Sequence, residues 1–126
     1  MDYLPLFLDL NDRPCLVVGG GAVAARKLEL LLAAGARIEI VAPALGAHTR
    51  RLVDEHGIPV QSRGFAPSDL DGRVLVIAAT DDPALNRQVF ELGTARNMLV
   101  NSVDQPTISN VIFPAIVDRS PVIVAV

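Results

Sequence analysis

Apolar runs alternate along the chain with stretches of helical periodicity. Runs without polar alternation are typical of strands in a parallel sheet covered on both faces, and we expect strands at about 14–18, 37–42, 59–62, 73–79, 98–103 and 111–113. Between them, apolar residues that recur every three or four positions predict helices at about 22–34, 45–56 and 84–96. This order predicts an α/β fold with a doubly wound parallel sheet and right-handed crossovers.

The expected helix at 84–96 has the clearest beginning. Asp82 is suited to cap its first amides, and Pro83 fits the first helical position. Leu85, Val89 and Leu92 then recur at the spacing of a buried face.

A glycine turn joins the first strand to the first helix with the spacing Gly19-x-Gly21-x-x-Ala24. Gly19 permits a tight turn, and Gly21 has no Cβ to keep a phosphate away from the backbone. Ala22 and Val23 begin the helix, and their N–H groups lie at the end where the helix dipole favours an anion. In this strand-turn-helix context the motif predicts a Rossmann-type site for the pyrophosphate of NAD.

Ligands of such sheets bind beyond the carboxyl ends of the strands. Pro43 and Ala44 follow the second strand, and Thr80 follows the fourth, so we expect all three to contact the cofactor. The acidic residue that often binds the adenosine ribose is missing after the second strand. No Arg follows directly to receive an additional phosphate, which favours NAD over its phosphorylated form.

Composition narrows the class of protein. The 126 residues are 51% hydrophobic, and a chain of this length fits one domain. No apolar run reaches the roughly 20 residues that a helix needs to span a bilayer. A net charge of −3 argues against general nucleic-acid binding. The single cysteine cannot form an internal disulfide, which is compatible with the cytoplasmic location that we expect.

Further motifs occur in order along the chain. They are Met1-Asp2-Tyr3-Leu4-Pro5-Leu6-Phe7, Val18-Gly19-Gly20-Gly21-x-Val23-Ala24-x-Arg26-Lys27, Ala78-Ala79-Thr80-Asp81-Asp82 with Leu85-Asn86, Val100-Asn101-Ser102-Val103-Asp104-Gln105-Pro106, and Phe113-Pro114-Ala115 with Asp118-Arg119-Ser120-Pro121. Together they closely resemble the N-terminal domain of siroheme synthase, the precorrin-2 dehydrogenase and sirohydrochlorin ferrochelatase family. The resemblance covers essentially the whole chain.

The resemblance implies two activities in one pocket. Such proteins use NAD to oxidise precorrin-2 to sirohydrochlorin, and then assist insertion of ferrous iron to give sirohaem. It also implies that Asp104 serves both steps, and a carboxylate at the tip of the fifth strand is chemically suited to accept the protons that both steps release. The alternative for Asp104 is an ordinary turn residue before Pro106. Iron enters as a substrate, so we expect no resident metal site.

We expect two units, the NAD-binding domain over 1–113 and the start of a dimerisation segment over 114–126. The family resemblance implies a homodimer for the full-length protein, and the apolar run from Pro121 to Val126 has no evident partner strand. Two alternatives stay open: an NAD-sensing regulatory domain without catalysis, and a structural domain whose glycines bind no ligand.

Other polar residues receive structural interpretations. Arg26, Lys27 and Glu29 share one arc of the first helix, which predicts a solvated face. His48 and His56 lack the spacing of a metal site, and Cys15 lies within a strand as a small core residue.

Overall fold

Branched aliphatic residues form the centre of a five-stranded parallel sheet. The computed structural model describes residues 1–103, 105–114, 116–119 and 122–125. Its strands are β1 (Pro14–Val18), β2 (Arg37–Val41), β3 (Val60–Gln61), β4 (Leu75–Ala78) and β5 (Leu99–Ser102), in the order β3-β2-β1-β4-β5. Strands β2 and β3 are added on one side of β1, and β4 and β5 on the other side. This change of side confirms the doubly wound α/β fold.

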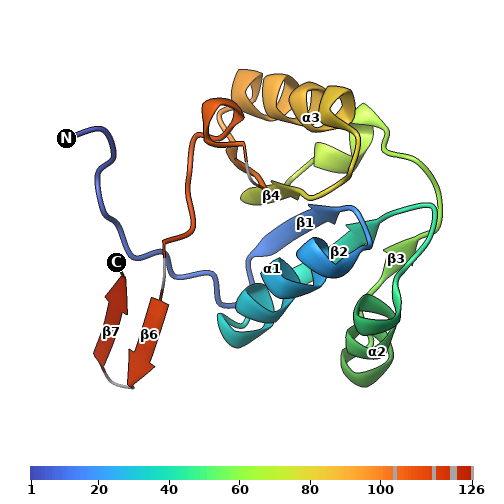
Figure 1. Ribbon diagram of the computed structural model, residues 1–126, viewed down its shortest axis with the longest axis horizontal. Helices are drawn as coiled ribbons and strands as arrows, with labels where there is room; N and C mark the ends of the chain where they lie inside the picture. The colour runs from blue at the N-terminus through green and yellow to red at the C-terminus, as the bar shows by residue number, and fades with distance from the viewer. Residues whose placement is uncertain (104, 115, 120–121, 126) are drawn as a thin grey trace.

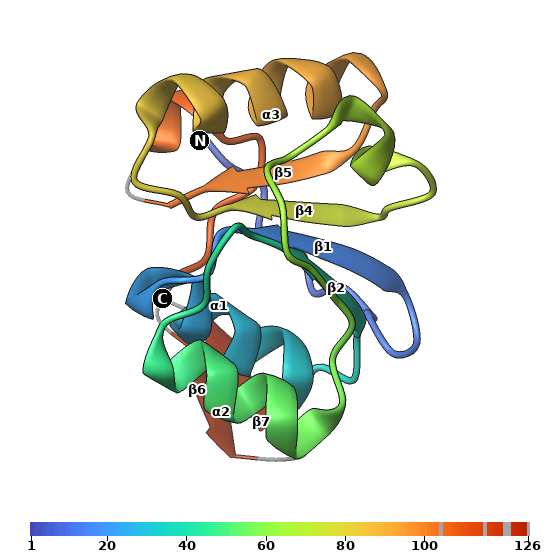
Figure 2. The same ribbon diagram turned by 90° about the vertical axis from the view of Figure 1, so that its right-hand side faces the viewer.

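Helices cover both faces of the sheet. Helices α1 (Ala22–Ala33) and α2 (Ala47–His56) lie on one side, and α3 (Pro83–Ala95) lies on the other (Figures 1 and 2). Leu28 and Leu31 of α1 pack with Ile40 and Ile77 in one core cluster. Val89 of α3 belongs to a second cluster on the opposite face. Among the described residues, the structure has no helix with the length and apolar character needed to cross a membrane.

The predicted beginning of α3 is confirmed. The Asp82 carboxylate accepts hydrogen bonds from the N–H groups of Ala84 at 3.0 Å and Leu85 at 3.3 Å, and Pro83 occupies the first helical position. This cap fixes where the chain leaves β4 and enters the helix.

The predicted strand at 111–113 is wrong. The side chain of Asn110 accepts a hydrogen bond from the N–H of Val100 at 2.7 Å, and Asn110 in turn donates its own N–H to the Val100 carbonyl at 3.0 Å. A side chain therefore replaces the regular ladder beside β5, after the short 3₁₀ helix at Pro106–Ile108.

The final apolar run does find a partner strand. Strand β7 (Val122–Ala125) pairs with β6 (Ile116–Arg119) in an antiparallel hairpin that is separate from the main sheet. Figure 1 shows this hairpin standing apart from the five-stranded sheet. The division into units at 113 and 114 stays a prediction.

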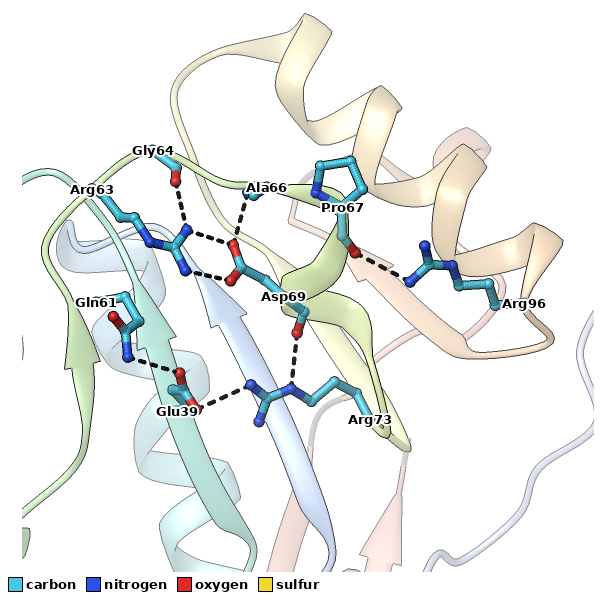
Figure 3. A network of polar contacts seen from close by, with 9 residues as sticks. All are labelled: Glu39, Gln61, Arg63, Gly64, Ala66, Pro67, Asp69, Arg73 and Arg96. Carbon is cyan, nitrogen blue, oxygen red and sulfur yellow. Dashed lines mark hydrogen bonds and ion pairs between the residues drawn. The ribbon is translucent and has the colours of Figure 1, made fainter.

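Between β3 and β4 the chain has only a 3₁₀ turn, Pro67–Leu70, where a helix would often cover the sheet. Asp69 holds this connection (Figure 3): its carboxylate accepts two hydrogen bonds from Arg63, at 2.6 and 2.9 Å, and one from the N–H of Ala66 at 2.7 Å. Beside it, Arg73 donates to Glu39 of β2 at 3.1 Å and to the carbonyl of Asp69 at 3.0 Å. Charged pairs thus tie this connection to the sheet.

We predict that Asp69→Asn lowers the free energy of unfolding at pH 7 by about 2 kcal/mol, because it removes charged hydrogen bonds at a side chain that is 6% exposed. The hydrogen bonds from Arg63, followed by that from Ala66, hold the pKa of Asp69 below its usual value despite its burial. A depressed folded pKa contributes stability above the unfolded value of about 3.9 that is lost as the pH falls through the folded pKa. Urea unfolding between about pH 7 and pH 2 should therefore show the parent converging on the variant in acid.

The control is Asp71→Asn. Asp71 pairs with Arg96 at 3.1 Å through a side chain that is 74% exposed, and exposed pairs contribute less than about 1 kcal/mol. Equal losses in the two variants would contradict the assigned importance of Asp69.

Candidate functional site

A cleft of about 780 Å³ lies at the carboxyl ends of the parallel strands. The turn after β1 forms its floor, and the segments after β2, β4 and β5 contribute the walls. The cleft thus lies beyond the carboxyl ends of β1 and β4, the neighbouring strands from which the sheet extends in opposite directions.

All seven residues predicted to contact the cofactor line this one cleft. They come from three loops far apart in the sequence, and are Gly19, Gly21, Ala22, Val23, Pro43, Ala44 and Thr80. The structure therefore brings the predicted set together, and their contacts with a cofactor stay a prediction.

Two glycines of the turn are required by the fold itself. Gly19 has φ +125°, and a Cβ there would lie 2.3 Å from the carbonyl oxygen of Ala79. A Cβ on Gly20 would lie 2.3 Å from the carbonyl oxygen of Ala44. The Gly20 carbonyl also accepts a hydrogen bond from the N–H of Gly46 at 2.8 Å, just before α2 begins. Side chains at these positions would separate the loops that form the cleft.

Gly21 is different, because a Cβ at this position would meet no atom within 4 Å. Gly21 precedes α1, whose first internal hydrogen bond runs from Ala25 N–H to the Gly21 carbonyl, and no side chain caps the helix. The hydroxyl of buried Thr49 donates to the same carbonyl at 3.2 Å and holds the turn. The first amides of α1 are therefore available to an anion in the cleft.

Ala42, Pro43 and Ala44 form the wall after β2. Glu39, the acidic residue nearest in sequence, is bound to Arg73 and Gln61 instead. Among the described residues that line the cleft, Asp81 and Asp82 are the charged ones, and no Arg or Lys is present there. A ligand must be held mainly by backbone groups on this wall.

On the opposite wall, a buried amide connects two strand ends. The Asn86 Oδ1 accepts from the Thr80 hydroxyl at 2.7 Å, while its Nδ2 donates to the Thr80 carbonyl at 3.0 Å and to Gln105 Oε1 at 3.3 Å. Asn86 and Gln105 line the cleft, but the sequence analysis assigned neither a role. The available signal was a polar residue on the buried face of α3, one turn before Val89.

Asp104, the predicted catalytic residue, lies outside the described residues. Its neighbours in sequence, Val103 and Gln105, line the cleft.

The predicted solvated face of α1 is only partly correct. Arg26 and Glu29 are exposed, and Glu29 pairs with His48 at 2.8 Å. Lys27 is half-buried, because its Nζ lies 4.5 Å from the centroid of the Phe113 ring, a contact between residues far apart in sequence.

Cys15 is buried within β1, as expected, and burial raises the pKa of its thiol. A thiol with a raised pKa is a poor nucleophile. Among the described residues, His, Cys, Asp and Glu form no group of three or more that could hold a metal ion.

Comparison with known proteins identifies similar chains. Residues 6–115 match the family described as "Putative NAD(P)-binding". The whole chain is 56% identical to a siroheme synthase of Pseudomonas entomophila strain L48, and covers 27% of that protein. It is 53% identical to a siroheme synthase of Thioalkalivibrio sulfidiphilus, of which it covers 26%. The chain thus spans about a quarter of these curated relatives.

A solved structure agrees with the sequence matches. The fold superimposes on SirC, a precorrin-2 dehydrogenase, with a TM-score of 0.85 and 30% sequence identity. The match covers 98% of this chain and 60% of that one. The resemblance noted from the motifs is therefore confirmed by both comparisons.

We predict that Gly20→Ala lowers the free energy of unfolding by about 1–3 kcal/mol, because the new Cβ would collide with the backbone of Ala44. Gly21→Ala should cost less than about 1 kcal/mol, because the space beside Gly21 is open. Denaturant unfolding of both variants would measure the difference. Equal stabilities would contradict the close approach at Gly20.

Proposed function

Since the chain belongs to the NAD(P)-binding family matched over residues 6–115, and is similar along its whole length to siroheme synthases, we propose that it binds NAD and oxidises precorrin-2 to sirohydrochlorin. The observation that carries this proposal is the side-chain-free turn at Gly21, which opens into the cleft beside the first amides of α1.

The residues present fit a dinucleotide. Gly21 leaves space for the pyrophosphate, and the Ala22 and Val23 amides at the positive end of the α1 dipole would bind it. The backbone at Pro43 and Ala44 would hold the adenosine half, and Thr80 would contact the nicotinamide half. The absence of Arg and Lys among the described lining residues leaves an additional 2′-phosphate without a cation, which supports NAD over NADP.

Oxidation of precorrin-2 removes a hydride and a proton from the substrate. NAD, when bound, supplies the hydride acceptor. We assign uptake of the proton to Asp104, on the strength of the family resemblance and of its position directly after Val103 at the end of β5.

The proposal extends to the second activity and to the assembly. Ferrochelation would use ferrous iron and sirohydrochlorin as substrates, with Asp104 accepting the protons that leave the pyrrole nitrogens. A homodimer and a cytoplasmic location complete the proposal. All of these rest on the similarity to siroheme synthases, whose length this chain covers only in part.

The alternative is an NAD-sensing domain without catalysis. It is favoured by one observation: the titratable groups among the described lining residues are Asp81 and Asp82, and Asp82 is engaged as a helix cap. A sensor would bind NAD and leave precorrin-2 unchanged, so an assay of turnover separates the two functions.

We predict that Gly21→Asp weakens NAD binding at least tenfold without loss of stability. An Asp at this position would cap α1, occupying the amides assigned to the pyrophosphate, and would repel it. Calorimetric titration of NAD would measure the change. Gly64→Asp is the control, because it adds the same charge at an open position outside the cleft. Equal affinity in parent and Gly21→Asp would place the phosphates elsewhere.

We also predict that Asp104→Ala abolishes dehydrogenation, since the substrate would lose its proton acceptor, while NAD affinity stays within about threefold. The measurement uses a preparation that oxidises precorrin-2, with sirohydrochlorin followed by its absorbance. Asp71→Ala is the control, because Asp71 does not line the cleft. Oxidation at the parent rate would remove Asp104 from the mechanism.

A further inference from the structure

The Asn86 side chain is a fully engaged amide in the wall of the cleft. It is 3% exposed, accepts two hydrogen bonds at Oδ1 and donates two from Nδ2. An amide offers two donors and two acceptor lone pairs, so all of its capacity is used. The side chain has no freedom to serve a ligand itself, and any effect on a ligand must pass through Thr80 and Gln105.

Backbone groups fix which end of the amide is oxygen. The N–H of Thr80 donates to one end at 3.3 Å, and the carbonyl of Thr80 accepts from the other at 3.0 Å. Because a backbone N–H can only donate and a carbonyl can only accept, the first end must be Oδ1 and the second Nδ2. The orientation of Asn86 is therefore set by the chain at the end of β4.

This orientation fixes the polarity of the Thr80 hydroxyl. The single hydroxyl proton points to Asn86 Oδ1 at 2.7 Å, with the Asp82 carbonyl as a longer alternative at 3.2 Å. One lone pair of the hydroxyl accepts the Asp82 N–H at 3.2 Å. One lone pair remains, so Thr80 offers the cleft an acceptor and no donor.

Gln105 offers the cleft a hydrogen-bond donor, where Thr80 offers an acceptor. Its Oε1 accepts from Asn86 Nδ2 at 3.3 Å, which orients the Gln105 amide. Within the part of the chain that the structure describes, Gln105 Nε2 has no hydrogen-bond partner. Gln105 lines the cleft and offers a donor.

We propose that Thr80 and Gln105, oriented by Asn86, form a subsite that recognises the primary carboxamide of the nicotinamide ring. A carboxamide presents an NH₂ donor and a carbonyl acceptor, the complement of an acceptor at Thr80 and a donor at Gln105. A carboxylate in its place has no donor for Thr80 and would meet the negative charges of Asp81 and Asp82 in the same cleft. Asn86 is the positioning residue of this subsite, and the inference rests on the proposed function.

Asn86→Asp tests the positioning role, because it keeps the shape and the acceptor for the Thr80 hydroxyl but removes the donor to Gln105 and to the Thr80 carbonyl. Gln105 then turns its NH₂ toward the introduced carboxylate and its oxygen toward the cleft, which reverses its polarity. Gln105→Glu also removes the donor that Gln105 offers to the cleft. Gln105 is half-buried, and this substitution leaves the core of α3 intact. Gln88→Glu, exposed on α3, is the control for added charge.

Calorimetric titration would compare three ligands: NAD, nicotinic acid adenine dinucleotide with a carboxylate in place of the carboxamide, and ADP-ribose without the ring. We expect the parent and Gln88→Glu to bind NAD at least tenfold tighter than the carboxylate analogue. In Asn86→Asp and Gln105→Glu, NAD should bind about tenfold more weakly relative to ADP-ribose.

The outcomes separate two failures. A parent that binds neither NAD nor ADP-ribose overturns the cofactor site itself. A parent that binds NAD and the carboxylate analogue equally, or a folded variant with an unchanged ratio of NAD to ADP-ribose affinity, overturns the carboxamide subsite alone. If circular dichroism shows that Asn86→Asp does not fold, the ratio measured for Gln105→Glu decides.

Discussion

The close approach of three backbone segments at the turn after β1 is the constraint on which the molecule depends. Gly19 touches the end of β4 at Ala79, and Gly20 touches the segment after β2 at Ala44. The N–H of Gly19 also donates to the Val41 carbonyl at 3.0 Å, and the N–H of Ala79 to the Val18 carbonyl at 2.8 Å. The strands on both sides of β1 are thereby joined at the edge where the cleft opens. Because the turn after β1 carries no side chains, its backbone can approach the neighbouring segments closely. The same backbone forms part of the surface of the cleft.

Local sequence patterns were sufficient for most of this architecture. The apolar runs predicted the five parallel strands, and Asp82 with Pro83 predicted the beginning of α3, because both depend on residues close together in the chain. Sequence patterns also placed the seven residues predicted to contact the cofactor in one cleft, since strand ends in a parallel sheet meet at one edge, while the contacts themselves stay a prediction.

The contacts that sequence reasoning missed join distant residues or irregular backbone. Asn110 replaces a ladder beside β5 with its side chain, which apolar periodicity does not reveal. Lys27 is drawn against Phe113 by a tertiary contact, and Asn86 reaches Gln105 from another element. Asp104 stays a prediction, because it lies outside the described residues.

The three neighbouring glycines are under different evolutionary constraints. A Cβ on Gly19 or Gly20 would collide with backbone atoms, so selection for a stable protein alone would preserve both glycines. A Cβ at position 21 would meet no protein atom within 4 Å, so the space there favours a small residue chiefly when a ligand is bound. In a lineage that abandoned the nucleotide, position 21 would accumulate larger residues while positions 19 and 20 stayed fixed. The residue found there thus distinguishes copies of this fold that still use the turn from copies that merely inherited it.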